Sequence, residues 1–397
     1  MAKEDTVGAQ GPVDFSLVLG GPLYQLLLRS HLTEPSLAHV QRRILAAVGI
    51  TWLPIALLAL AGGKFFGGVS VPFLYDVDVH VRFLIALPML IGAELLIHRR
   101  LRVIVGQFIE RDLLAPDDRP RFERIIADTM RLRNSVAIEI ILLVIAFTAG
   151  YWAWRAEASL NVVSWYATSG HDVLSFTPAG YWYAFVSVPI FRFVLLRWYF
   201  RLFVWYVFLF RVSRLPLQLN PLHPDSAGGL EFLSQSLEAI SPILVAQSAF
   251  LSGLIANQIL NAGAALPDFK VLIASVAVFL MLLPLLPLLF FMPMLAVAKR
   301  AALREYGAFA ARYTGDFRRK WLRAAEINDS ELLGSADIQS LADLGNAFAV
   351  VHNMRLLPFN RNSIVRLVIS IAIPLLPLAL TMFPFGVIMQ QLLQLLL

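Results

Sequence analysis

Three arginines stand inside one apolar stretch of the sequence, residues 181–210: Arg192, Arg197 and Arg201. An ionised side chain at membrane depth costs at least about 2.5–3.5 kcal/mol, so such residues face protein or water rather than lipid. On an α-helix Arg197 and Arg201 project within about 40° of each other, whereas Arg192 points about 140° away from Arg197. This scatter excludes the one-sided arginine ladder of a voltage sensor.

Two glutamates offer the opposite charge. Glu94 and Glu139 each lie near the end of another apolar stretch, on the side of the membrane where we also expect Arg201. The candidate buried charge network therefore comprises Glu94, Glu139, Arg192, Arg197 and Arg201. The two glutamates are expected to pair with Arg197 and Arg201. Three roles stay open: structural links between helices, part of a proton or anion path, and snorkelling of the arginines to the interface.

A second polar feature lies in the apolar stretch 240–262. Its four amide side chains project within a sector of about 100° on a helix, and they are Gln247, Asn257, Gln258 and Asn261. Such a face either bridges neighbouring helices by hydrogen bonds or lines a hydrated cavity that recognises a solute. Gly253, near the middle of this stretch, permits close helix approach in either case.

The loop 220–230 reads Asn-Pro-Leu-His-Pro-Asp-Ser-Ala-Gly-Gly-Leu. Its prolines and paired glycines predict a tight, non-helical path, and Asp225 or Ser226 is a candidate cap for the next helix. His223 and Asp225 are also candidates for binding a metal or moving a proton. Two ligands do not specify a metal site, so the structural turn and the functional loop both stay open.

The composition places these polar groups in a membrane protein. Apolar residues make up 58% of the 397 residues and charged residues only 15%, with a mean hydropathy of +0.69. Soluble domains carry about 25% charged residues. Cysteine is absent, which excludes disulfides and thiolate metal sites. We see no cleavable signal peptide in residues 1–16, because they contain no apolar core.

Seven stretches are long enough to cross a bilayer as helices, for which roughly 20 apolar residues are needed. They are Ile44–Gly63, Val81–Ile97, Val136–Trp154, Tyr181–Phe210, Ile240–Ala262, Val271–Ala298 and Ile364–Met389. The sequence thus predicts an all-α, polytopic transmembrane helix bundle of about seven spans. Whether the tail 390–397 extends the last span or lies at the interface stays open.

Prolines are frequent in these stretches. Four of them contain one internal proline each, namely Pro54, Pro88, Pro189 and Pro242, and the string Pro-Leu-Leu-Pro-Leu occurs twice, at 284–288 and 374–378. An internal proline frees a carbonyl and bends its helix, and broken helices often bound transport sites. Membrane helices also tolerate proline without any such role.

Most of the 33 Lys and Arg residues fall in segments that would share one side of the membrane. The positive-inside rule then places the N-terminus in the cytoplasm. We expect membrane helices in 44–97, 136–298 and 364–397. The cytoplasmic segments are then 1–43, whose apolar patch Leu23–Leu28 is expected to lie flat on the inner leaflet, 98–135 and 299–363. In 98–135 we expect two short helical extensions joined by a turn.

The segment 299–363 is expected to form two amphipathic helices that stay close to the membrane. The first carries Arg304, Arg312, Arg318, Arg319 and Lys320, which suit anionic headgroups. After a break at Gly334, apolar residues recur every three or four positions from Ile338 to Val351, which predicts the second. Anionic lipids are therefore the expected partners; a homo-oligomer stays open, and no nucleic-acid partner is expected.

Two motifs carry a resemblance. Leu222–Leu230 and Leu332–Leu344 resemble stretches of uncharacterised bacterial multi-pass membrane proteins. The resemblance implies a bacterial inner-membrane location and brings no activity with it.

Several functions are disfavoured by missing motifs. The sequence has no phosphate-binding loop of the Gly-x-x-x-x-Gly-Lys type, no His-Glu-x-x-His and no Gly-x-Ser-x-Gly. We expect no enzyme activity and no cofactor. A channel or secondary transporter for an ion or small solute is the leading hypothesis. The alternative is a membrane scaffold or sensor that acts through 299–363, and a lipid-modifying enzyme is a third.

Overall fold

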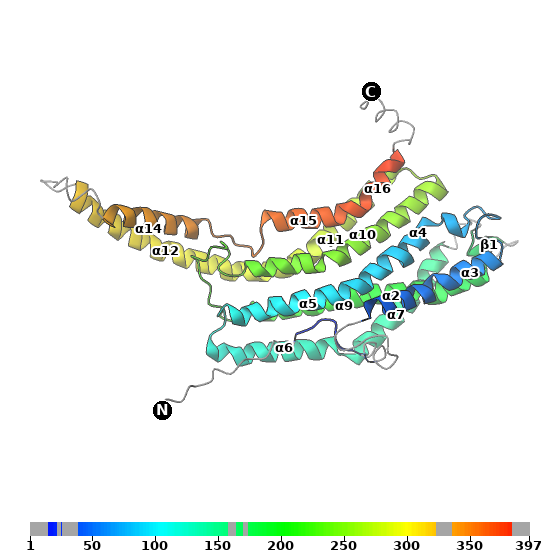
Figure 1. The fold of residues 1–397 in the computed structure, drawn as a ribbon, viewed down its shortest axis with the longest axis horizontal. Coiled ribbons are helices and arrows are strands. Elements are labelled where there is room, and N and C mark those ends of the chain that lie inside the picture. Colours follow the sequence, from blue (N-terminus) through cyan, green and yellow to red (C-terminus); the bar gives the residue numbers. More distant parts are fainter. Residues whose placement is uncertain are drawn as a thin grey trace, which may run out of the picture.

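The structure is a computed structural model that describes residues 15–21, 25, 39–157, 164–169, 174–322 and 336–382. Long helices run along one common axis and form an elongated bundle (Figure 1). The predicted all-α class is confirmed. A small antiparallel pair of strands, β1 (Ala167–Ser169) and β2 (Leu174–Phe176), is the exception among the described residues.

The α-helices in chain order are α2 (Val40–Thr51), α3 (Leu53–Ala61), α4 (Val77–His80), α5 (Leu87–Glu110), α6 (Arg119–Arg133), α7 (Val136–Glu157), α8 (Pro178–Trp182), α9 (Val188–Val212), α10 (Gln235–Ala262), α11 (Lys270–Leu285), α12 (Met292–Phe317), α14 (Ala336–His352), α15 (Arg361–Ala372) and α16 (Leu376–Ala379). Short 3₁₀ segments are η1 (Phe73–Tyr75), η3 (Pro116–Asp118), η6 (Glu231–Ser234), η7 (Leu266–Phe269), η8 (Leu286–Phe291), η10 (Ile373–Leu375) and η11 (Leu380–Met382). Three segments are π-helical: η2 (Val81–Ala86), η5 (Tyr183–Ser187) and η9 (Arg318–Leu322).

Six helical segments of the described chain are long and apolar enough to cross a membrane. They are Val40–Ala61, Val77–Glu110, Pro178–Val212, Glu231–Ala262, Leu266–Leu322 and Arg361–Met382. The sequence predicts about seven spans, and the difference is α7, in which Val136–Thr148 counts as a shorter apolar helix. The chain is therefore a multi-pass membrane protein.

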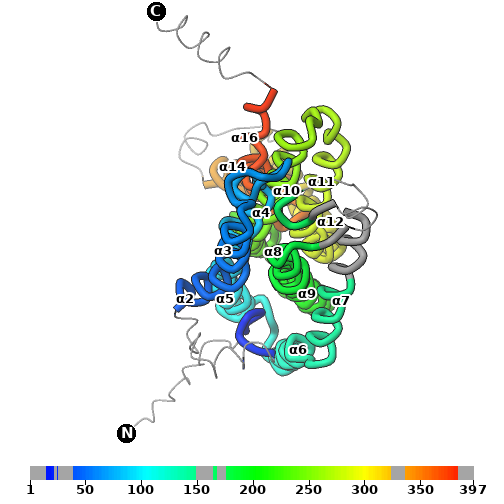
Figure 2. The backbone as a smooth tube through the Cα atoms, turned by 90° about the vertical axis from the view of Figure 1, so that its right-hand side faces the viewer, coloured from blue at the N-terminus to red at the C-terminus, as the bar shows by residue number. Residues whose placement is uncertain are grey.

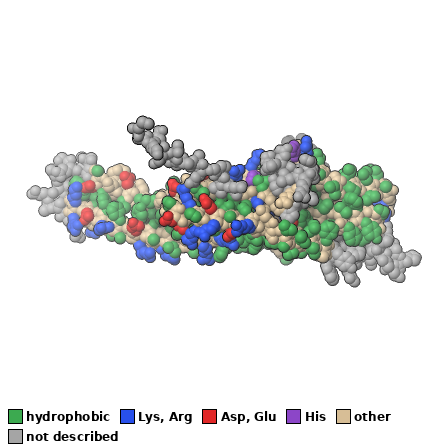
Figure 3. Space-filling model, turned by 90° about the horizontal axis from the view of Figure 1, so that it is seen from below, with side chains coloured by type: hydrophobic (Ala, Val, Ile, Leu, Met, Phe, Trp, Pro, Cys, Tyr) green, Lys and Arg blue, Asp and Glu red, His purple; other side chains and the backbone are tan. Residues whose placement is uncertain are grey.

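The helices form layers across the bundle. Viewed along the axis, α2, α5, α9 and α7 lie side by side in a row, with α10 on one side of the row and α6 on the other (Figure 2). Helix α15 packs against α10. Basic side chains concentrate toward the half with α6 and the α12–α14 hairpin, and apolar side chains cover most of the other half (Figure 3). We call these the basic end and the far end.

Prolines explain where the helices lose their regular hydrogen bonding. Pro88 and Pro189 each stand one residue inside a helix and each follows a π-helical turn, η2 and η5. A proline ring collides with the carbonyl four residues earlier and donates no hydrogen bond, so the preceding turn widens. The two Pro-Leu-Leu-Pro-Leu strings lie at the 3₁₀ segments η8 and η10.

The 3₁₀ segment η8 does not end its helix. From Leu266 to Leu322 the chain continues as one helical path of 57 residues, roughly 85 Å long. Beyond the bundle α12 pairs with α14, so that the two project from the basic end (Figure 1). Within segment 299–363, α12 keeps the direction of α11 along the bundle axis, and α14 packs against α12 (Figure 1). The expected closeness of this segment to the membrane stays a prediction.

The other segments predicted to lie outside the membrane helices also have defined places. In 98–135, α5 continues to Glu110 and a turn leads into α6, which packs beside α9. Residues 15–21 contribute Phe15 to the interior, where its ring contacts Trp205 and Phe208. The patch Leu23–Leu28 and the break at Gly334 fall largely outside the described residues, as does the tail 390–397.

At Gly253, α10 packs tightly against η2. A Cβ atom there would lie 2.7 Å from Cβ of Val81. We expect Gly253→Ala to destabilise the protein by about 1–3 kcal/mol, because the two helices must separate. Unfolding by titration with SDS in mixed micelles measures this loss.

Two variants control that prediction. Gly92→Ala, on α5, adds a Cβ that meets nothing within 4 Å and should not destabilise the protein. Adding Val81→Gly to Gly253→Ala should restore part of the loss. A destabilisation of the same size in Gly92→Ala would mean that loss of glycine flexibility, and not helix contact, causes the effect.

Candidate functional site

Glu94 is the centre of the buried charges. Its Oε1 accepts a hydrogen bond from Nη1 of Arg201 at 2.7 Å and lies 3.8 Å from Nη1 of Arg197. Its Oε2 accepts from Nη1 of Arg43. One carboxylate on α5 thus contacts three guanidinium groups, two from α9 and one from α2. The Arg201 guanidinium also lies over the ring of Trp198, 4.8 Å from its centre.

Glu139, in the first turn of α7, completes the network. Nε of Arg197 lies 3.5 Å from Oε1 of Glu139, and Nη2 of Arg197 donates to the carbonyl of Gly20 at 3.4 Å. Gly21 has φ +88°, and a Cβ there would lie 2.9 Å from Oε2 of Glu139, so the chain needs glycine at this position. All five side chains of the network are at most 15% exposed, and they are Arg43, Glu94, Glu139, Arg197 and Arg201.

The structure therefore brings together Glu94, Glu139, Arg197 and Arg201, and it adds Arg43. Sequence reasoning missed Arg43 because it directly precedes an apolar stretch, a position from which arginine usually reaches to the interface. Arg192 does not share these contacts and lines a separate cavity instead. The network links α2, α5, α7 and α9, and its dense pairing favours the structural role among the three that the sequence leaves open.

The amide side chains on α10 mostly connect helices. Tyr199 on α9 donates to Oε1 of Gln247. Asn261 donates to Oδ1 of Asn257 at 2.7 Å and to the carbonyl of Tyr75 at 3.1 Å. Gln258 is exposed. These contacts favour the bridging interpretation of the amide face over a solute-lined cavity.

The loop after α9 is organised by Asp225. Its Oδ1 accepts from the backbone N–H groups of Ala227 (2.8 Å) and Gly229 (3.1 Å), and its Oδ2 accepts from that of Glu231 (3.1 Å). Burial raises the pKa of Asp225, but these hydrogen bonds and nearby His223 outweigh it and bring the pKa below its ordinary value. With its oxygens committed to amides, Asp225 acts here as the predicted cap and turn residue.

His223 and Asp225 lie next to each other, as their spacing suggests. Nδ1 of His223 is 3.0 Å from Oδ1 of Asp225. Among the described residues, no group of three or more His, Asp or Glu side chains is arranged to hold a metal ion. Arg355 fastens the loop to the chain after α14, because its Nη2 donates to the carbonyl of Asp225 at 2.6 Å.

A cavity of about 260 Å³ lies between α9 and α10, toward the far end. We call it the aromatic cavity. It is lined by two arginines, Arg82 and Arg192, and by the rings of Tyr166, Phe176, Tyr183, Phe191 and Phe250. Phe250 stands 12 residues before α10 ends, so the cavity reaches about 18 Å into the helical region. Both π-helical turns that precede Pro88 and Pro189 contribute to its wall.

Arg82 is held in a fixed position at this cavity. Its Nη1 donates to the hydroxyl of Tyr183 at 3.0 Å, and its Nη2 pairs with Asp78 one turn earlier. Its guanidinium lies over the ring of Phe250, 5.0 Å from the ring centre. Arg82 was not among the residues predicted from the sequence. The available signal was its spacing of four residues from Asp78 at the start of an apolar stretch.

Comparison with protein-family models, with curated proteins and with solved structures finds no match for this chain. The site therefore has to be interpreted from its own geometry.

Proposed function

We propose that this protein is a secondary transporter or channel for a small organic anion, and that the anion binds in the aromatic cavity. The observation that carries the proposal is the pairing of two guanidinium groups with aromatic walls inside the membrane-spanning region. None of the described residues that line the cavity is Asp or Glu, and the lining contributes two guanidinium groups, of which that of Arg82 pairs with Asp78 outside the lining. Its volume is slightly below the range of about 300–1,000 Å³ of typical ligand pockets, which fits a small solute.

The chemistry of the lining defines the substrate class. Arginine binds carboxylate and sulfonate groups through its planar set of donors. The rings of Phe191 and Phe250 provide apolar contact for the rest of the molecule. The π-helical turns η2 and η5 form part of the wall, and such turns are frequent at functional sites. The expected substrate is therefore an anion with a compact aromatic or branched apolar part.

The charge network lies between the aromatic cavity and the basic end. Arg197 follows Arg192 on α9 by five residues, about 7.5 Å along the helix. Its ion pairs with Glu94 and Glu139, at 3.8 and 3.5 Å, are longer than the 2.7 Å contact between Arg201 and Glu94. In our proposal Arg197 is the member that must move for an anion to pass toward the basic end.

Binding and flux of benzenesulfonate test the proposal, because this anion stays ionised at neutral pH. The wild-type protein should bind benzenesulfonate in detergent and carry it into proteoliposomes, and should not bind neutral benzenesulfonamide. Arg192→Gln should weaken binding by about 10- to 100-fold, the usual cost of a lost hydrogen bond to a charged group.

The matched control is Arg99→Gln, which removes an exposed arginine of the basic end. It should bind like wild type. Equal binding of the neutral analogue, or unchanged binding by Arg192→Gln, would place the anion elsewhere. Binding without flux of any anion in a broad panel would remove transport as the function.

A scaffold or sensor is the second candidate, and the projecting α12–α14 hairpin favours it (Figure 1). Lys320 and Trp321 both donate to Oδ2 of Asp337, at 2.6 and 3.0 Å, and so fix the hairpin near its tip. The flux assay separates the two candidates: a wild-type protein that transports nothing in the panel leaves the hairpin as the functional element.

We further propose a bacterial inner-membrane location with the basic end in the cytoplasm. The positive-inside rule supports this orientation, since the arginines of α6 and α12 lie at that end. Because the chain has no cysteine, single introduced cysteines can report its orientation in the membrane. Cysteine at position 304 should resist an impermeant thiol reagent added outside cells, and cysteine at 263 should react; the reverse pattern would invert the orientation.

A further inference from the structure

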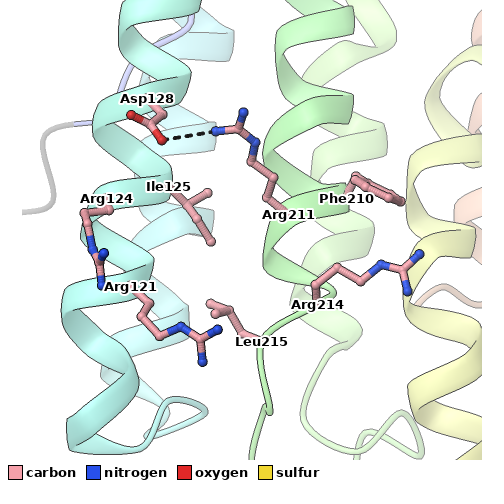
Figure 4. Close-up of a pocket in the computed structure, with 8 residues that line it drawn as sticks. All are labelled: Arg121, Arg124, Ile125, Asp128, Phe210, Arg211, Arg214 and Leu215. Atoms are coloured by element: carbon pink, nitrogen blue, oxygen red, sulfur yellow. Dashed lines mark hydrogen bonds and ion pairs between the residues drawn. The ribbon is translucent and has the colours of Figure 1, made fainter.

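A second concave site lies at the basic end, between α6 and the end of α9. Its volume is about 360 Å³. We call it the basic groove. Four arginines and one aspartate line it, together with the apolar side chains Ile125, Phe210 and Leu215 (Figure 4).

The basic groove carries a net positive charge, although Asp118, outside the lining, pairs with Arg121 at 3.2 Å. Arg121 and Arg124 come from α6, and Arg211 and Arg214 from the end of α9 and the residues that follow it. Asp128 is the one carboxylate among the described residues of the lining. It is shared, at 3.4 Å each, between Arg211 inside the groove and Arg131 outside it.

The two walls present their guanidinium groups differently. Figure 4 shows Arg121 pointing from α6 into the gap toward Leu215, while Arg211 reaches from α9 toward Asp128. Arg214 lies over the ring of Phe210, 4.9 Å from its centre. Figure 4 shows Arg214 pointing away from α6, so its guanidinium group and that of Arg121 lie on different sides of the groove and offer donors to an anionic headgroup from separate positions.

The groove continues into an apolar track on α9. Phe203 and Phe210 stand seven residues apart, so they share one face of the helix, and both are exposed, at 54% and 44%. Phe210 also packs against Phe290 of η8, 5.3 Å between ring centres. A free anion has no use for this track, whereas a lipid with an anionic headgroup fills both the track and the groove.

We propose that the basic groove binds one acidic phospholipid, with its anionic headgroup over the arginines of the groove and an acyl chain along Phe203 and Phe210. Basic pockets between helices at the cytoplasmic surface are known to bind anionic headgroups. The bound lipid connects α6 to α9 by charge. This proposal does not depend on the proposed transport function, since the aromatic cavity shares no residue with the groove.

The test uses the full-length protein in neutral detergent and native mass spectrometry with added lipids. Wild type should retain one phosphatidylglycerol molecule in preference to phosphatidylcholine. The double variant Arg121→Gln/Arg214→Gln should lose this preference, with binding about 30-fold weaker if each arginine contributes about fivefold. Arg121→Gln and Arg214→Gln alone should each give an intermediate loss.

The matched control is Arg304→Gln/Arg312→Gln, which removes the same charge from exposed positions of α12. It should bind phosphatidylglycerol like wild type, and both double variants should keep the wild-type melting temperature. Equal losses in the two double variants would show general charge attraction and overturn the proposal. Inorganic phosphate or glycerol phosphate that displaces the lipid at equal concentration would assign the groove to a free anion instead.

Discussion

Glu94→Ala should destabilise this protein more than any other single substitution in the charge network. We expect it to lower the free energy of unfolding by about 3–5 kcal/mol. The variant leaves Arg43, Arg197 and Arg201 buried with only Glu139 nearby, and Glu139 contacts Arg197 alone among the three. An uncompensated buried charge is costly because neither water nor a counter-ion solvates it. Titration with SDS in mixed micelles, followed by tryptophan fluorescence, measures the loss.

Glu238→Ala is the matched control for Glu94. Glu238 also pairs with two arginines, Arg100 and Arg366, but its side chain is 37% exposed. Exposed ion pairs contribute about 0–1 kcal/mol, so this variant should be close to wild type. If the two variants lose the same stability, the Glu94 network is hydrated in solution and an ion path through it becomes the better interpretation.

Asp225→Ala should have the second-largest effect on stability and lower the free energy of unfolding by about 2–4 kcal/mol. The substitution removes the acceptor of three backbone N–H groups, at Ala227, Gly229 and Glu231, and an unsatisfied buried donor costs about 1–3 kcal/mol. Water that reaches the partly exposed loop recovers part of this cost. Asp225→Asn keeps one acceptor oxygen and should fall between wild type and alanine in the same unfolding assay.

The pH dependence gives Asp225 an independent signature. Its pKa in the folded protein is lower than its ordinary value of 3.8, so its stabilising contribution is fully present above about pH 4. The contribution is lost as the pH falls through the lowered pKa. Wild type and Asp225→Asn should therefore differ in stability at pH 7, and the difference should be smaller at pH 3. Asp316→Ala, at an exposed position, should match wild type at both values.

The helices and the charge network could be predicted from the sequence for physical reasons. A helix must be about 20 apolar residues long to cross lipid, and charges inside such stretches need partners. Arg43 and Arg82 were not predicted in this way, because both flank apolar stretches, where arginine ordinarily reaches water. Which glutamate meets which arginine depends on the rotation of each helix, and that is set by packing.

The aromatic cavity was not predicted. Its wall includes the π-helical turns η2 and η5, which have no length or composition signal, whereas the close approach of α10 was indicated by Gly253. The prolines that cause the widened turns were visible, but proline alone does not indicate whether a helix kinks, widens or stays regular. The burial of Phe15 was missed because its short segment has no periodic pattern.

The helical path from Leu266 to Leu322 connects the far end to the tip of the hairpin without an intervening loop. Such a rod acts as a lever. A tilt of about 5° at its far end would displace a tip roughly 85 Å away by roughly 7 Å. Small rearrangements among the membrane helices would thus produce larger displacements at the opposite end of the molecule. A modest change in helix tilt would then be measurable at the tip of the hairpin.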